Sequence, residues 1–299
     1  MSIIQCDNLS KQYGNKLALD TVSLTLTQGA PIALVGPNGA GKTTLFSLLC
    51  GYIQPTSGSI SILGHKPGSK ALQGLLSALP QDAALDPNFS IVSQLQFFAQ
   101  LQGMTAAAAK QEALRVLTLV DLSDSAEAKP KSLSHGMSKR VSIAQALMGS
   151  PKIVLLDEPT AGLDPANAKK IRQIVKELSD HTTFVISSHN LDELEKLCDQ
   201  VVYLEHGKLQ QSVSIKANQA TDFITLTMKQ CDMDSLHQQL LGLNDIIEVR
   251  RIGDEQYVIE YQKQSSFAIE IQLFELFTAN QWQYKAILKG RTLEETLFS

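Results

Sequence analysis

The chain has 299 residues, of which 43% are hydrophobic and 19% charged. This is roughly the length of two globular domains and excludes a disordered or collagen-like protein. The formal net charge of −4 argues against a broadly basic surface, so no nucleic-acid partner is expected. No uninterrupted apolar run exceeds four residues, whereas a membrane-spanning helix needs about 20, and we expect no membrane span. The four cysteines form no CxxC pair, which is typical of reduced thiols in a cytoplasmic protein.

Strand patterns begin the chain. Alternating apolar residues predict strands at residues 2–9, 18–26 and 58–63, and a compact apolar run at 32–35 predicts a short buried strand. A helical pattern follows at residues 43–51 and ends at a glycine. The first part of the chain is therefore predicted to be mostly strand, with one early helix.

The middle of the chain is predicted to be helical. Between residues 92 and 147, apolar residues recur at helical spacing, as at Leu95, Phe98 and Leu101. After this stretch the pattern returns to compact apolar runs that are typical of buried parallel strands. The strands predicted there are at 153–156, 183–187 and 201–204. One helix is predicted between the first two strands, and another, at 190–198, between the last two.

The last third of the chain has the pattern of a separate domain. A polar stretch at residues 212–221 predicts a linker, and residues 213–299 hold eight Lys/Arg and twelve Asp/Glu, which is the whole acidic excess. We therefore predict domains at 1–212 and 213–299, the second a small α+β ferredoxin-like domain of order β-α-β-β-α-β. Its predicted strands are 223–228, 246–252, 256–261 and 283–288, its helices 233–241 and 267–279, with a tight turn at 253–254 and a last helix at 293–298.

A glycine-rich sequence connects the strand at 32–35 to the helix that follows. Residues 36–43, GPNGAGKT, fit the phosphate-binding pattern G-x-x-x-x-G-K-[ST] in its expected context between a strand and a helix. Glycines let backbone N–H groups surround a polyphosphate at a helix N-terminus, where the dipole favours anions. Lys42 would reach the β- and γ-phosphates, and Thr43 would place its hydroxyl on Mg²⁺. The flanking elements argue against an incidental glycine-rich turn.

Two acids end the apolar strand at 153–156. Asp157 would hold Mg²⁺ beside the phosphate-binding loop, and Glu158 is placed to orient or deprotonate an attacking water. The alternative is a pair of acids that caps the next helix or pairs with a lysine. The nearby phosphate-binding loop favours a nucleotide site.

Together these motifs resemble those of the ATP-binding cassette (ABC) ATPases, over residues 1 to about 210. The resemblance implies an α/β fold, a P-loop NTPase cassette with a parallel-sheet core, an antiparallel β subdomain and a helical subdomain. It also implies ATP and Mg²⁺ as cofactors. The matching motifs are Tyr13 as the adenine-stacking aromatic, residues 36–43 as Walker A, Gln81 in LPQD as the Gln loop, residues 133–137 (LSHGM) as the signature, Asp157 and Glu158 as Walker B, residues 161–164 (AGLD) as the D-loop, and His189 as the switch histidine.

The resemblance gives these residues three kinds of role. It implies catalysis by Lys42, Gln81, Glu158 and His189, and metal binding by Thr43, Gln81 and Asp157. Nucleotide contacts are implied for Tyr13, Gly36, Pro37, Asn38, Gly39, Ala40, Gly41, Lys42, Thr43, Thr44, Ser134, Gly136 and Asp164. Ordinary alternatives exist for the single residues, such as a covered edge for Tyr13, a loop amide for Gln81 and a helix cap for Ser134.

The signature departs from the family pattern at two positions. His135 stands where the family has glycine, and Met137 stands where it has glutamine. Ser134 and Gly136 remain, and they supply the hydroxyl and the close backbone approach, so we expect phosphate binding to survive. Signatures of this form resemble those of exporter cassettes that pair with separate membrane subunits.

The resemblance implies that one chain cannot complete its own site. Two cassettes would meet head to tail, with ATP between residues 36–43 of one and 134–136 of the other, and twofold symmetry gives two sites. We expect a homodimer at the cytoplasmic face of a membrane, attached through a separate permease that docks on the helical region 87–147. The alternatives are a soluble ABC ATPase and a regulatory cassette protein. Residues 213–299 show no catalytic group, and we expect a small docking or dimer-stabilising domain there.

Overall fold

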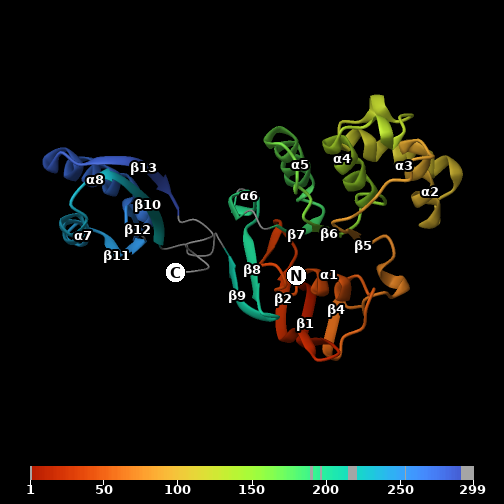
Figure 1. Ribbon diagram of the computed structural model, residues 1–299, viewed down its shortest axis with the longest axis horizontal. Coiled ribbons are helices and arrows are strands. Elements are labelled where there is room, and N and C mark those ends of the chain that lie inside the picture. The colour runs from red at the N-terminus through yellow and green to blue at the C-terminus, as the bar shows by residue number, and fades with distance from the viewer. Residues whose placement is uncertain (1, 189–190, 196, 215–220, 253, 291–299) are drawn as a thin grey trace. The chain divides into compact units, whose positions relative to one another are not determined.

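The computed structural model describes residues 2–188, 191–195, 197–214, 221–252 and 254–290. They belong to two compact units, Met1–Ile215 and Lys216–Ser299, which Figure 1 shows with their elements labelled. His189, Gly253 and the predicted last helix at 293–298 lie outside the described residues. Within the described ranges, no helix is long and apolar enough to cross a membrane.

Three antiparallel strands form the first sheet. They are β1 (Ser2–Tyr13), β2 (Lys16–Thr27) and β4 (Ser57–Ile62), in the order β2-β1-β4. The first two strands are longer than predicted, and beyond the predicted end of β1 its register against β2 shifts between Leu9 and Lys11 and again between Lys11 and Gln12. Such an irregularity interrupts the alternation of apolar residues, and so hides the rest of the strand in the sequence.

A six-stranded sheet forms the centre of the first unit, in the order β5-β6-β7-β3-β8-β9. The first five strands are parallel, and β9 is antiparallel to β8. Every residue of β3, β6 and β7 is buried, as expected for parallel strands covered on both faces. The strands are β3 (Ile32–Val35), β5 (Leu76–Leu79), β6 (Ile153–Asp157), β7 (Thr183–Ser187), β8 (Gln200–Glu205) and β9 (Lys208–Ser214).

The predicted helical stretch at 92–147 contains three α-helices, α2, α3 and α4, which pack together as a lobe (Figure 1). Ser90, Thr105 and Ser134 cap them by accepting a backbone N–H from the first turn. The helices of the first unit are α1 (Lys42–Leu49), α2 (Ile91–Leu101), α3 (Ala106–Leu119), α4 (His135–Ala146), α5 (Pro165–Leu178) and α6 (Leu191–Glu195), with 3₁₀ turns at Lys70–Leu72, Ser123–Ser125 and Pro130–Ser132.

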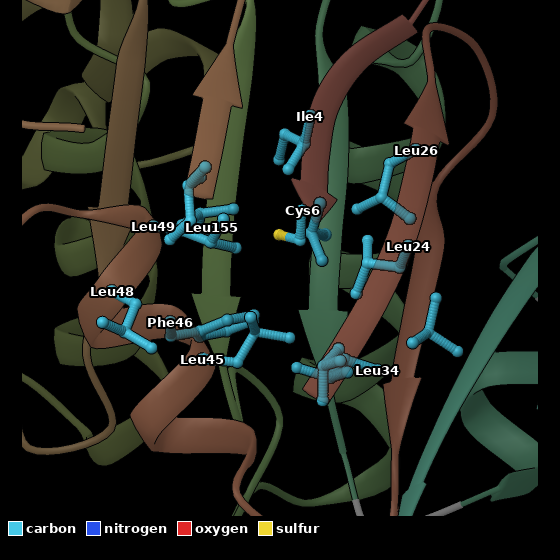
Figure 2. Close-up of a cluster of buried hydrophobic side chains, with 14 of the residues drawn as sticks. Ile4, Cys6, Leu24, Leu26, Leu34, Leu45, Phe46, Leu48, Leu49 and Leu155 are labelled. Atoms are coloured by element: carbon cyan, nitrogen blue, oxygen red, sulfur yellow. The ribbon is translucent and has the colours of Figure 1, made fainter. Parts of the chain in front are cut away.

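The main core lies between the two sheets of the first unit. Leu45, Phe46 and Leu49 of α1 pack there with Ile4 of β1 and Leu155 of β6, and Figure 2 shows these side chains converging. Burial of this apolar surface fixes α1 against both sheets, because each buried aliphatic or aromatic side chain contributes about 1.5–3 kcal/mol. The loop that precedes α1 is thereby held at the carboxyl end of β3.

The second unit has the predicted order β-α-β-β-α-β. Its antiparallel sheet has the order β11-β12-β10-β13, an element order known as the split β-α-β arrangement. The core of this unit lies between the sheet and both helices, and Tyr257, Ile259 and Tyr261 of β12 belong to it. The elements are β10 (Thr221–Gln230), α7 (Met233–Leu241), β11 (Ile246–Ile252), β12 (Gln256–Gln262), a 3₁₀ turn at Lys263–Ser265, α8 (Ser266–Asn280) and β13 (Gln283–Lys289).

Candidate active site

The glycine-rich loop connects β3 to α1 and can be built only with glycine at two positions. Gly36 has a φ of 154°, and a Cβ there would lie 2.1 Å from the carbonyl oxygen of Leu204. Gly41 has a φ of 106°, and a Cβ there would lie 2.7 Å from the carbonyl oxygen of Ala18. Gly41 is also the N-cap of α1, and no side chain caps this helix. The start of α1 therefore offers backbone N–H groups and a positive helix end to an anion.

Lys42 folds back over this loop. Its Nζ donates to the carbonyl oxygens of Gly36 at 2.6 Å and Pro37 at 3.1 Å. Burial lowers the pKa of Lys42, while the neighbouring carboxyl groups of Glu158 and Asp157 act in the opposite direction. The ammonium group thus lies over the loop on two neutral oxygens, which phosphate oxygens would replace with stronger, charge-assisted bonds.

The two acids at the end of β6 are held by the neighbouring strand. The hydroxyl of Ser187, the last residue of β7, donates to Oδ1 of Asp157, and Thr43 Oγ1 donates to Oδ2 at 3.4 Å. The backbone N–H of Glu158 lies 3.1 Å from both the carbonyl oxygen and the hydroxyl of Ser187. Both acids are buried, and Glu158 has a φ of 50°, in the left-handed region that only a few per cent of non-glycine residues adopt.

These groups lie in one cleft of the first unit. Tyr13 stands at it half exposed, with Lys11 Nζ 5.1 Å from the centre of its ring. Lys16 and Ala18 also line the cleft, although their sequence context carries no motif. The lining residues are Tyr13, Lys16, Ala18, Asn38, Gly39, Ala40, Gly41, Lys42, Thr43, Thr44, Gln81, Asp157 and Glu158. The cleft thus combines phosphate-binding backbone, an ammonium group, carboxylates and an aromatic side chain.

Gly36 and Pro37 do not line this cleft, although their carbonyl oxygens accept from Lys42 beside it, and Ser134, Gly136 and Asp164 do not line it either. Ser134 caps α4 by accepting the N–H of Met137 at 3.2 Å. A Cβ at Gly136 would lie 2.5 Å from the side chain of Asn167, which donates to Asp164 Oδ2 at 2.6 Å. The signature and the D-loop therefore lie side by side in one chain, and the predicted site residues divide into two groups.

Ser187, Asn167 and Lys139 are site residues that no motif indicated. The signal for Ser187 was its place at the end of the predicted strand 183–187, level with the acids. Lys139 donates from α4 to the carbonyl oxygen of Gln81 at 3.2 Å. Burial lowers the pKa of Lys139, and nearby carboxyl groups, chiefly that of Asp82, oppose this.

Comparison with known proteins agrees with this geometry. A family model described as ABC transporter matches residues 19–161. The linearmycin resistance ATP-binding protein LnrL of Bacillus subtilis (strain 168) is 36% identical over 211 residues, which cover 69% of this chain and 68% of that protein. The chain belongs to the ABC transporter family.

Further ABC proteins support the assignment. Nod factor export ATP-binding protein I of Burkholderia orbicola (strain AU 1054) is 36% identical over 213 residues, covering 70% of each chain. A dimeric ATP-binding cassette, MJ0796, in a post-hydrolysis state with ADP and phosphate, aligns with a TM-score of 0.66 at 26% identity, covering 72% of this chain and 100% of that one. The ADP form of the cassette MJ1267 aligns with a TM-score of 0.65 at 26% identity, covering 72% and 91%.

These findings confirm the predicted cassette fold and the predicted activity. This ABC protein binds ATP, hydrolyses it and energises a membrane transporter. ABC ATP-binding subunits work with transmembrane permease components, and dimeric cassettes occur among the solved structures.

Proposed function

We propose that this chain is the ATPase subunit of an ABC exporter and hydrolyses Mg²⁺-ATP in sites completed by a second copy of itself. The observation that carries the proposal is the separation of the site residues. The cleft holds Lys42 and Glu158, whereas Ser134, at the start of α4, lies outside it. A capped helix start is an anion site, and a second chain placed head to tail would present it to the nucleotide. A dimeric cassette with ADP and phosphate among the structural relatives supports this arrangement.

The residues around Asp157 fit Mg²⁺. Its Oδ2 lies 3.4 Å from Thr43 Oγ1, and Gln81, whose side chain carries an amide oxygen, lines the same cleft. Within the described ranges no group of three or more His, Cys, Asp or Glu could hold a metal, which suits an ion bound through one or two side chains and substrate phosphates. When bound, Mg²⁺ would neutralise charge on the phosphates.

Side chains and backbone groups of this chain would activate the attacking water and stabilise the phosphate charge. Glu158 is buried beside the cleft with its backbone fixed by Ser187, so its carboxylate can orient an attacking water or accept its proton. Lys42 would hold the phosphate oxygens, and the loop N–H groups would stabilise their charge. By family resemblance, His189 would contact the transferred phosphoryl group, and Tyr13 would stack on adenine.

The names of two relatives, the form of the signature and two exposed side chains support the proposed direction of transport and the proposed membrane partner. One relative is named for Nod factor export and another for linearmycin resistance, and the signature has an exporter-like form. Phe89 and Phe97 are 56% and 57% exposed on the helical lobe, whereas Leu95 is 1% exposed. Phe89 and Phe97 therefore remain outside the core of the lobe, where a separate permease would dock and hold the subunit at the cytoplasmic face.

Replacing the general base tests the proposal. We expect Glu158→Gln to lower the ATP hydrolysis rate at least about 100-fold, since general-base catalysis contributes about 10²–10⁴-fold, while ATP binding remains. With ATP and Mg²⁺, this variant should elute as a dimer in gel filtration, and Lys42→Ala should lose ATP binding.

The matched control is Glu127→Gln, which changes an exposed glutamate of the same unit and should hydrolyse ATP normally. Wild-type turnover by Glu158→Gln would refute the catalytic assignment. A Glu158→Gln variant that binds ATP yet stays monomeric at all concentrations would refute the composite site.

A further inference from the structure

Lys139 and Gln81 form a contact that joins the two groups of site residues within one chain. Gln81 follows β5 in a tight turn, in which the N–H of Ala83 donates to the carbonyl oxygen of Pro80 at 3.3 Å. The ammonium of Lys139 donates to the carbonyl oxygen of Gln81 at 3.2 Å. Because α4 also packs against β5, the helix holds both the turn and the strand that leads to it.

The position of Lys139 on α4 gives this contact a consequence. Lys139 lies five residues after Ser134, which is about 7.5 Å along the axis at about 1.5 Å per residue. A helix of this length moves as one body, so a displacement of its start is passed to Lys139. Gln81 lines the cleft, and its backbone carbonyl oxygen is the atom that Lys139 holds.

We propose that Lys139 is a positioning residue that couples the start of α4 to the Gln81 turn. Through it, engagement of Ser134 with a partner's nucleotide sets the position of Gln81 in the chain's own cleft. In a dimer, α4 of each chain would contact the partner's nucleotide through Ser134 and its own Gln81 turn through Lys139. The two nucleotide sites would then be energetically coupled. The inference rests on the proposed function, because only the composite site brings a nucleotide to Ser134.

The test removes the ammonium and keeps the length of the side chain. In Lys139→Met we expect the ATP dependence of hydrolysis to change from sigmoidal to hyperbolic, and kcat to fall by about tenfold, within the range of typical coupling. ATP binding and the thermal unfolding temperature should stay as in the wild type. Lys139→Arg, which restores a cation that can reach Gln81, should recover both cooperativity and kcat.

Lys110→Met is the matched control, because it removes an exposed lysine from α3 of the same lobe. The inference is overturned if Lys139→Met keeps a sigmoidal ATP dependence with wild-type kcat, or if Lys139→Arg fails to restore what Lys139→Met loses. Should the Met variant unfold, Lys139→Gln is read by the same criteria. A failure of the underlying proposal is distinguishable, since Glu158→Gln with unchanged Lys139 would then remain monomeric with ATP.

Discussion

Asn167 connects the signature to the D-loop by filling the space that a side chain at Gly136 would need. Its backbone N–H and its amide both donate to the carboxylate of Asp164, at 3.0 and 2.6 Å. The backbone and side-chain hydrogen bonds from Asn167 and the N–H of Ala166 lower the pKa of Asp164. The carboxylate therefore stays ionised and holds the Asn167 amide against α4.

A methyl group at position 136 should displace this amide. We expect Gly136→Ala to lower the stability of the first unit by about 1–3 kcal/mol, as overpacking does, and to lower ATP hydrolysis because Ser134 moves with the start of α4. Urea unfolding and steady-state hydrolysis measure the two effects. Asn167→Ala in the Gly136→Ala background removes the clash and should restore part of the activity. A double variant no better than the single one would contradict this account.

The residues of the site differ in how far the sequence reveals them. The phosphate-binding loop at 36–43 was predictable because its chemistry resides in contiguous residues between a strand and a helix. Ser187 holds Asp157 from 30 residues away, and Lys139 reaches Gln81 from 58 residues away. Such contacts depend on which strands and helices become neighbours, which no local pattern specifies.

The elements of the chain show a similar division. In the second unit the four strands and two helices predicted between residues 223 and 288 are present, because each carries its own periodicity, and the helix predicted at 293–298 lies outside the described residues. In the first unit, two strands were not predicted, β5 and β9. The first has only four residues, and the second (KLQQSVS) is so polar that the predicted linker at 212–221 begins within it. Both lie at the edges of the six-stranded sheet, where a strand is defined by pairing with its neighbour more than by its own composition.

Glu112 of α3 is hydrogen-bonded to the segment that follows α4. Its carboxylate accepts two hydrogen bonds from Arg115, at 2.7 and 2.6 Å, and one from the N–H of Gly149 at 2.7 Å. Arg115 also donates to the carbonyl oxygen of Leu147 at 3.2 Å. The hydrogen bond from Arg115, followed by that from Gly149, lowers the pKa of Glu112 below its ordinary value of 4.5.

The sign of the resulting pH dependence follows from this direction. A carboxyl whose pKa is lower in the folded state stabilises the fold above its ordinary value of 4.5, and loses this contribution as pH falls through the folded-state pKa. We expect Glu112→Gln to cost about 1 kcal/mol at neutral pH, a modest figure because Arg115 is partly exposed. The difference from the wild type should shrink as the pH falls below 4.5 and through the lower folded-state pKa of Glu112. Urea unfolding at several pH values checks this, and a constant difference would contradict it.

Across the whole molecule, charge and chemistry are divided between the two units. Residues 213–299 carry the entire acidic excess, whereas Lys42, Asp157 and Glu158 of the cleft belong to the first unit. The second unit has a complete sheet with two helices and a core of its own, including Leu226, Tyr257 and Leu273. We propose that it acts as an accessory domain that docks a partner or stabilises the dimer.

The separate cores predict that the units fold separately. A chain ended after Ile215 should keep the ATP affinity of the full chain within about twofold, since every lining residue remains and domains with their own core fold alone. Residues 216–299 expressed alone should unfold cooperatively in urea, with a smaller m-value than the first unit because less surface becomes exposed. Nucleotide binding by equilibrium titration and unfolding followed by circular dichroism measure these outcomes.

If the shortened chain lost ATP binding while remaining folded, the second unit would be part of the site. If the shortened Glu158→Gln chain bound ATP but dimerised more weakly than the full-length variant, the dimer-stabilising role would be supported, because nucleotide binding and assembly would then depend on different units.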